Sequence, residues 1–325
     1  MPTLSKLTKD AFHSETAAFG YLEATLWPDG AVCPHCGTVG RATRLQTNGG
    51  SKDGKRQARL GLWKCNEKEC RKQFTVKVGT VFEHGRIPLH KMLQAVYLLC
   101  CSKKGCSSHQ LHRVLGITYK AAWFLSHRIR EAMRTGALGP MGGPGGVVEV
   151  DETYIGHIEG VPHPKHLRHK NMVMTLVERG GGARSFHLDG MAISDIMPIL
   201  RENIAKESQI VTDEAKSYYD VGKEFAGHDT VNHGREEYVR YTADPNYVIT
   251  TNTVEGFYSI FKRGMKGVYQ HCSEKHLHRY LAEFDFRYST RVRLGVNDEA
   301  RTGRALKGIV GKRLTYRNPN VTAAE

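Results

Sequence analysis

Apolar side chains in the first 140 residues recur mainly at intervals of three and four, which is the spacing of one helix face. Residues 1–25 place Phe12, Phe19 and Leu22 among polar neighbours and predict a short amphipathic helix. The same period in residues 88–135 predicts a module built from several helices.

From residue 147 onward, apolar runs typical of strands alternate with helical patterns. Strands are predicted at residues 147–155, 172–177, 185–188 and 209–212, and helices at about 194–204, 251–264 and 274–288. This alternation favours an α/β fold.

These patterns divide the chain into six segments. We expect an amino-terminal helix (1–30), a cysteine-bearing module of short strands (31–80), a helical module (86–138), a Gly/Pro linker (139–146), an α/β core (147–290) and a basic tail (291–325). Glycine and proline dominate residues 139–146, as is typical of a linker. The tail after Ala300 is expected to be a mobile basic end.

The charge of the chain is strongly basic and unevenly distributed. Its 325 residues carry a formal net charge of +14 at pH 7. Residues 1–140 hold 22 basic and 9 acidic side chains and residues 255–325 hold 14 and 7, whereas residues 141–254 hold 11 and 17. Basic surfaces bind polyanions by releasing counterions, so nucleic acid is the expected partner, with mere solubility as the alternative. Carboxylates in the acidic middle would repel a polyanion unless a metal ion lay between them.

The sequence shows no sign of a membrane or secretory protein. No run approaches the roughly 18 apolar residues that a membrane span requires, and the first 25 residues lack the pattern of a signal peptide. We therefore expect a cytoplasmic protein with reduced cysteines.

Two close cysteine pairs predict a metal site. Cys33 and Cys36 form one pair, and Cys65 and Cys70 form the other, with 28 residues between the pairs. Four thiolates on two turns suit a tetrahedral structural Zn²⁺, and the doubled spacing favours this zinc ribbon over a redox motif or incidental buried cysteines. Phe74 is placed to cover the cluster. The remaining cysteines are expected to be packing residues: Cys100, Cys101, Cys106 and Cys272.

The sequence of residues 107–125 predicts a helix, a turn and a second helix. Ser107 or Ser108 can cap the first helix, Gly116 can close the turn, and Thr118 can cap the second helix. The second helix is expected to expose five side chains suited to DNA: Tyr119, Lys120, His127, Arg128 and Arg130. This pattern predicts a helix-turn-helix-like module that contacts phosphates or a groove, and a plain helical hairpin stays open as the alternative.

The acidic middle contains residues suited to a second metal site. Asp151 lies in a strand whose Val148 and Val150 face one way while Glu149 and Asp151 face the other, and Asp213 ends a later strand. A helix then carries four polar side chains on one face: Asn252, Glu255, Ser259 and Lys262.

Two strand-end aspartates facing an oxygen ligand on a helix suit two divalent ions, Mg²⁺ or Mn²⁺. Such a pair activates an attacking hydroxyl and stabilises the leaving oxygen in phosphodiester chemistry. Lys262 could reach a DNA phosphate there. Each carboxylate taken singly is compatible with a surface group, so the inference depends on the set.

The motifs around these residues resemble a known family. Val-Glu-Val-Asp-Glu-Thr-Tyr-Ile-Gly around Asp151, Thr-Asp-Glu-Ala-Lys-Ser-Tyr around Asp213, and the long motif at 251–264 are similar to the integrase-like transposase domain of ISXO-like bacterial insertion sequences. Residues 276–288 resemble the closing helix of that group, which also carries an amino-terminal zinc ribbon and a helical module. The resemblance covers residues 15–290.

The resemblance implies a ribonuclease H-like core and a DDE-type transposase that cleaves and joins DNA strands with the help of metal ions. Asp151, Asp213 and Lys262 match the family's catalytic set. Its third member is Asn or Glu, so Asn252 and Glu255 both stay open, although a carboxylate is the better Mg²⁺ ligand. His233 either assists near the site or is structural.

The implied partners are double-stranded transposon ends (terminal inverted repeats) and target DNA. Lys262 and Arg263, besides the basic residues of the helical module, are the expected DNA contacts. We expect a homo-oligomer on DNA, in the bacterial cytoplasm and associated with the nucleoid. A non-catalytic DNA-binding regulator and a stand-alone nuclease are the alternatives.

Overall fold

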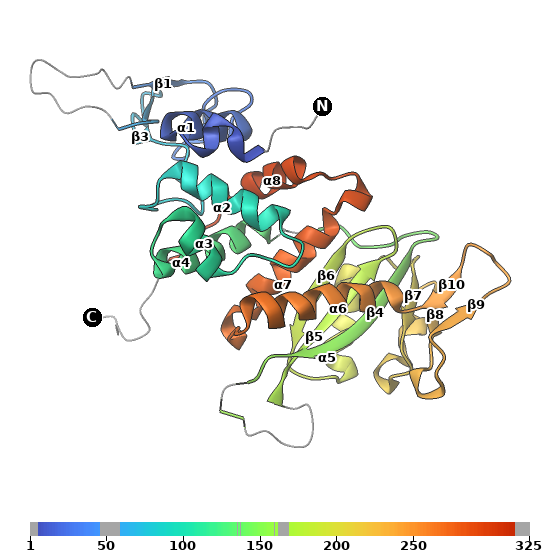
Figure 1. Cartoon of the computed structure of the whole chain (residues 1–325). Coiled ribbons are helices and arrows are strands. Elements are labelled where there is room, and N and C mark those ends of the chain that lie inside the picture. Colours follow the sequence, from blue (N-terminus) through green and yellow to red (C-terminus); the bar gives the residue numbers. More distant parts are fainter. Residues whose placement is uncertain are drawn as a thin grey trace, which may run out of the picture. The chain divides into compact units, whose positions relative to one another are not determined.

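The computed structural model describes residues 6–45, 59–134, 136, 138–158, 160–161 and 169–315. The expected loop at 48–55 lies outside these residues. The chain forms two compact units (Figure 1). The first comprises Met1–Ser102, Cys106–Met133 and Asp298–Glu325, and the second comprises Lys103–Gly105 and Arg134–Asn297.

The first unit begins with a helix and a small sheet. Helix α1 (Glu15–Leu26) starts later than the predicted one, because Ser14 caps it by accepting a hydrogen bond from the Ala17 N–H at 3.4 Å. Short 3₁₀ turns precede it. Strands β1 (Ala42–Arg44), β2 (Trp63–Cys65) and β3 (Gln73–Phe74) form an antiparallel sheet in the order β1-β2-β3.

Three further helices in this unit follow the predicted pattern: α2 (Leu89–Cys101), α3 (Ser108–Leu115) and α4 (Tyr119–Met133). The Ser107 hydroxyl accepts from the Gln110 N–H at 3.1 Å and caps α3. Gly116 ends α3 in the left-handed conformation at φ 58°, which glycine adopts without a steric penalty. The Thr118 hydroxyl accepts from the Ala121 N–H at 3.2 Å at the start of α4. The local capping signals are therefore confirmed.

Residues 301–315 differ from the expected mobile end, and the rest of that predicted tail lies outside the described residues. Helix α8 (Asp298–Lys307) belongs to the first unit, and its Leu306 and the following Ile309 are fully buried. Arg301 donates to the backbone oxygen of Cys100 at 3.1 Å. The apolar positions of this short helix were hidden among its many charged residues, and burying them orders the segment.

The second unit is built on a mixed sheet of five strands in the order β6-β5-β4-β7-β8. Its strands are β4 (Val147–Ile155), β5 (Asn171–Glu178), β6 (Ala183–Leu188), β7 (Gln209–Thr212) and β8 (Gly227–Thr230). β5 pairs antiparallel with β4 and β6, whereas β7 pairs parallel with β4 and β8. The predicted strands are confirmed. β8 was not predicted, and neither were the two paired strands β9 (Val239–Tyr241) and β10 (Val248–Thr250).

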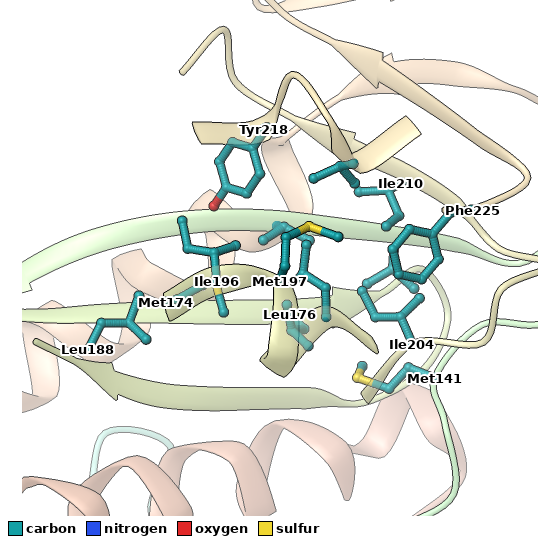
Figure 2. Close-up of a cluster of buried hydrophobic side chains, with 14 of the residues drawn as sticks. Met141, Met174, Leu176, Leu188, Ile196, Met197, Ile204, Ile210, Tyr218 and Phe225 are labelled. Atoms are coloured by element: carbon teal, nitrogen blue, oxygen red, sulfur yellow. The ribbon is translucent and has the colours of Figure 1, made fainter. Parts of the chain in front are cut away.

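Helices cover both faces of this sheet (Figure 1). α5 (Ile193–Asn203) packs Ile196 and Met197 against one face, in the apolar cluster that Figure 2 shows. α6 (Asn252–Gly264) and α7 (Glu274–Ser289) cover the other face. Met174 and Leu176 of β5 point to the α5 side, and the alternating residues Val173 and Val177 point to the α6–α7 side. Both faces of β5 are thus buried.

The predicted Gly/Pro linker is part of the second unit. Met141 is buried in the cluster under α5 and forms a parallel bridge with Ile204. The Gly143 N–H donates to the Ser208 hydroxyl at 2.8 Å. One apolar side chain and these backbone hydrogen bonds fix a segment whose composition indicated a flexible connection. No helix in the described part of the chain is long and apolar enough to cross a membrane.

Candidate active site and zinc site

The sheet register brings two predicted carboxylates together. Glu149 of β4 lies opposite Val211 of the parallel strand β7. Asp151 and Asp213 each follow that pair by two residues in the same direction. They therefore lie side by side, Asp151 on its strand and Asp213 directly after the end of β7.

Helix α6 brings Glu255 to the same place. The buried Tyr258 hydroxyl donates to the backbone oxygen of Asp151 at 2.5 Å and fixes this turn of α6 against β4. Burial, together with the charges of Asp213 and Glu255, raises the pKa of Asp151 to about 7, against the opposing effects of a backbone hydrogen bond and of His233. Three of the predicted acidic residues therefore share one electrostatic environment.

His233 lies beside Glu255. Its Nε2 is 3.7 Å from Glu255 Oε1 and 3.4 Å from the hydroxyl of Thr251, which itself donates to Glu255 Oε1 at 3.1 Å. Glu214 accepts hydrogen bonds from the backbone N–H groups of His233 and Gly234, both at 3.0 Å. The residue after Asp213 thus anchors the loop that carries His233.

The other predicted residues of α6 lie at its two ends. Asn252 is the exposed first residue of the helix, and its backbone N–H donates to the Thr250 hydroxyl at 3.2 Å. Lys262 is half-buried near the end of α6, with Nζ 5.8 Å from the centre of the Tyr258 ring. Arg263 is exposed.

Sequence reasoning missed Glu152. Burial, together with the charges of Asp151 and Asp213, raises its pKa to about 8. Its Oε1 atom is buried and makes no hydrogen bond with any described residue. The adjacent Asp-Glu pair was the available signal, but strand alternation assigns Glu152 to the opposite side from Asp151. Only the fold shows that the charge of Asp213 raises the pKa of both carboxylates.

A second missed residue, Glu149, supports the site from beneath. Its fully buried carboxylate accepts from the backbone N–H groups of Thr253 and Val254 at 2.7 and 3.0 Å and from the Thr253 hydroxyl at 2.7 Å. These N–H groups belong to the first turn of α6, where backbone donors have no partner within the helix. Glu149 therefore joins α6 to the strand that carries Asp151.

The acidic residues offer oxygen ligands of the kind that Mg²⁺ and Mn²⁺ prefer. In the described residues, the carboxylate oxygens of these acidic residues are not all within 4.8 Å of one another. Ligand atoms lie this close together in two groups: the four cysteines, and His187 with Asp189 and Glu274. Asp151 on β4, Asp213 after β7 and Glu255 on α6 supply such carboxylate oxygens at one place, which is the chemistry of a divalent-cation site.

The four cysteines have the geometry of a zinc site. The Sγ atoms of Cys33 and Cys70, and those of Cys36 and Cys65, are each 3.7 Å apart. A tetrahedral ion with bonds of about 2.3 Å would separate its sulfur ligands by about 3.8 Å. Phe74 is buried against Cys33 and Cys65, as predicted. Hydrogen bonds from Thr38 lower the pKa of Cys36 to about 6, toward the thiolate that binds metal.

The basic side chains of α4 differ in exposure. Lys120 is exposed at its start, and Arg128 is half-buried with its guanidinium 4.7 Å from the centre of the Phe124 ring. The expectation that Arg130 is exposed is wrong: it is 1% exposed and donates to the Ser126 hydroxyl at 2.9 Å. His127 is buried as well. Both lie on the helix face that packs into the first unit, so their polar character misled the sequence reading.

The structure thus combines a four-cysteine cluster suited to zinc with an acidic site on a mixed α/β sheet, and comparison with known proteins identifies the family. Residues 144–289 match the ISXO2-like transposase domain, and residues 13–73 match the transposase zinc-ribbon domain. The chain is also 27% identical over 293 residues to an uncharacterized protein in transposable element ISH50 of Halobacterium salinarum, which covers 85% of this chain and 91% of that protein. The chain belongs to the ISXO2-like transposases with an amino-terminal zinc ribbon.

Proposed function

We propose that this protein is a DDE-type transposase of a bacterial insertion sequence, which binds the ends of its element and catalyses metal-dependent strand cleavage and strand transfer. One observation carries the proposal: Asp151, Asp213 and Glu255 come from three separate parts of the chain into one environment, where burial and the charges of the other two carboxylates raise the pKa of Asp151 to about 7. Mixed pairing with β4 at the centre of the sheet supports a ribonuclease H-like core.

Asp151, Asp213 and Glu255 would hold two Mg²⁺ or Mn²⁺ ions. Bound ions supply positive charge that activates the attacking oxygen and stabilises the leaving oxygen. In cleavage, a water oxygen attacks phosphorus and the bond to the 3′ oxygen breaks, which leaves a 3′ hydroxyl. In joining, that hydroxyl attacks a target phosphodiester, and the displaced target 3′ oxygen takes up a proton.

Glu255 is the third carboxylate in this proposal, and Asn252 is the alternative. Glu255 is oriented by the Thr251 hydroxyl and by His233, and its charge acts on Asp151. Asn252 lies one turn earlier at the helix terminus. Lys262 then contacts a phosphate two turns beyond Glu255.

DNA binding in this proposal involves the zinc ribbon and the α3–α4 pair, which acts as a helix-turn-helix. Lys120 and Arg128 on α4, and Lys262 and Arg263 on α6, contact phosphates of double-stranded DNA. Arg130 no longer belongs to this set. The active assembly is a homo-oligomer on the paired element ends.

The test is a strand-transfer assay with Mg²⁺ or Mn²⁺ and labelled DNA that carries the inverted repeats flanking the gene. Wild type should give joined products, and Asp213→Asn should bind the DNA without cleaving it. Cleavage without joining would favour a nuclease. DNA binding with neither reaction would favour a regulator, and either result would overturn the proposal.

A further inference from the structure

The helices of the first unit come from a long stretch of chain without acidic residues. Residues 84–130 contain eight Lys or Arg side chains and no Asp or Glu. Helices α2 and α3 and most of α4 lie within this stretch. Because carboxylates repel phosphates and Lys or Arg side chains attract them, these helices are the part of the unit best suited to face DNA.

Helix α4 offers DNA only its amino-terminal end. Its first two residues, Tyr119 and Lys120, are exposed, whereas every residue from 121 to 133 is buried or half-buried. The ring of Tyr119 stacks on that of His109 of α3, with centroids 4.3 Å apart, so this end of α4 is held beside α3. Helices that read bases in the major groove use exposed side chains spread over more than one turn. The second helix of the pair therefore does not fit the role of reading bases.

Helix α3 presents the open face that α4 lacks. Four of its residues are exposed: His109, Gln110, Arg113 and Val114. At about 100° per residue, these four side chains fall within an arc of about 140°. Leu111 and Leu115 on the opposite side are buried and attach the helix to the unit. Val114 is 60% exposed, so an apolar side chain stands in the open between polar ones.

Positive charge from three helices surrounds the turn between α3 and α4. Arg113 belongs to the last turn of α3, and Lys120 belongs to the first turn of α4. Lys91 of α2 reaches the same turn, since its Nζ is 3.8 Å from the position that a Cβ on Gly116 would occupy. Cations placed around an exposed helix face can contact the phosphates that border a groove and so fix the register of the helix on the duplex.

We propose that α3, rather than α4, enters the major groove of the element end and reads base pairs there. Arg113 contacts O6 and N7 of a guanine, Gln110 contacts N6 and N7 of an adenine, and Val114 contacts the methyl group of a thymine, which are the pairings that these side chains favour. Lys91 and Lys120 hold the bordering phosphates. Phosphates offer no partner to an apolar side chain, so the exposed Val114 favours base reading over backbone contact alone. This inference rests on the proposed function, which brings the inverted repeats to this unit.

The experiment measures the affinity of the full chain, carrying Asp213→Asn so that DNA is bound but not cut, for duplexes with the inverted repeat. Each guanine or adenine is replaced in turn by its 7-deaza analogue, which lacks N7, and each thymine by uracil, which lacks the methyl group. Affinity should fall at a few positions. Adding Arg113→Ala should abolish the effect at one guanine, and adding Val114→Ala should abolish it at one thymine, because the partner of the altered atom is already gone. Unchanged sensitivity at every position in both variants would overturn the proposal.

The preference for the inverted repeat over a scrambled duplex gives a second measure. Arg113→Ala should reduce it by about 5- to 150-fold, which is the range for one bidentate base contact. The matched control is Arg304→Ala, at an exposed arginine of α8 in the same unit, and it should leave the preference unchanged. Val114→Ala should not lower the melting temperature, because the side chain is mostly exposed and alanine favours a helix. Equal weakening of both duplexes by Arg113→Ala would make it a phosphate contact and overturn the proposal.

Further outcomes distinguish this inference from the proposed function. Strand transfer by the chain with its native Asp213, together with an unchanged base preference in the α3 variants, would leave the transposase intact and refute the role of α3. A lost base preference in those variants, in a protein that transfers no strand, would do the reverse. A changed oligomeric state of free Arg113→Ala with an unchanged base preference would assign this face to a contact between copies of the chain and overturn the proposal.

Discussion

Arg179 donates from Nε to Glu149 Oε1 at 2.7 Å, and this ion pair holds the carboxylate that caps α6 from the strand of the proposed active site. The other guanidinium nitrogens of Arg179 donate to the backbone oxygens of Val248 and Thr250 at 2.6 and 2.8 Å. Since Glu149 also caps α6, one buried carboxylate connects β4, β10 and α6. The relative position of Asp151 and Glu255 depends on this connection.

Glu149→Gln is expected to destabilise the protein by about 3 kcal/mol, because it leaves the Arg179 charge unpaired and weakens the cap. The change should appear in the free energy of unfolding from urea denaturation. Glu224→Gln is the control, since Glu224 forms an ion pair with Arg201 at the surface. It should cost less than about 1 kcal/mol. Equal effects of the two substitutions would show that the contacts of Glu149 with Arg179 and α6 add no more stability than a surface ion pair does.

Glu255→Gln and Asn252→Ala distinguish the two possible third ligands. We expect Glu255→Gln to slow Mn²⁺-dependent cleavage by at least about 100-fold, a loss at the upper end of that seen for residues that support a metal ligand. Asn252→Ala should slow it by less than about tenfold. Wild type should also gain melting temperature on addition of Mn²⁺, and Glu255→Gln should lose most of this gain. The reverse ranking would assign the role to Asn252.

Cys36→Ser should remove zinc from the first unit, because a hydroxyl is a poor substitute for the fourth thiolate. Metal analysis of purified protein should find one zinc ion per wild-type chain and clearly less in the variant, with a lower melting temperature. Cys101→Ser is the control, since Cys101 is a half-buried cysteine outside the cluster. A full zinc content in Cys36→Ser would contradict the ligand assignment.

Asp285 should make the protein less stable as pH rises. Burial raises the pKa of this carboxyl to about 7, against the hydrogen bonds from the Ser185 N–H and hydroxyl at 2.8 and 2.6 Å. Because the folded state holds the proton more tightly than the unfolded state, its contribution is complete below about pH 4 and is lost as pH approaches 7.

The corresponding slope of the unfolding free energy is at most about 1.4 kcal/mol per pH unit within that window. Urea denaturation at pH 5 and pH 7 should show a smaller difference for Asp285→Asn than for wild type. Asp220→Asn, at an exposed carboxylate paired with Lys223, should resemble wild type. A wild-type pH dependence in Asp285→Asn would show that another group is responsible.

Lys120→Ala and Arg130→Ala should affect different properties. Lys120→Ala should weaken DNA binding and reduce the slope of log affinity against log salt by about 1, with an unchanged melting temperature. Arg130→Ala should lower the free energy of unfolding by about 2 kcal/mol, because a buried side chain and its hydrogen bond to Ser126 are lost. A shallower salt slope in a stable Arg130→Ala would restore Arg130 as a DNA contact.

The sequence by itself determined the elements and the residues at their ends. The hydrophobic period predicted helices α1 to α7 and four of the sheet strands, because it reflects near neighbours along the chain, but it did not predict α8. The spacing of Cys33, Cys36, Cys65 and Cys70 predicted a cluster that the fold confirms. The sequence predicted that Asp151 and Asp213 both lie at strand ends, which is wrong for Asp151: it lies in the middle of β4, and the parallel pairing of β4 with β7 brings it beside Asp213.

Only the tertiary structure decided which polar residues are buried and what they contact. Glu149 is separated from Thr253 by 104 residues, and no local pattern links the two. Met141 in the Gly/Pro segment and Leu306 in the basic tail are core residues, while Arg130 is buried in a helix expected to expose it. Packing and strand register bring together residues that are distant in the chain, and they determine whether a charge faces water, a helix end or a cavity.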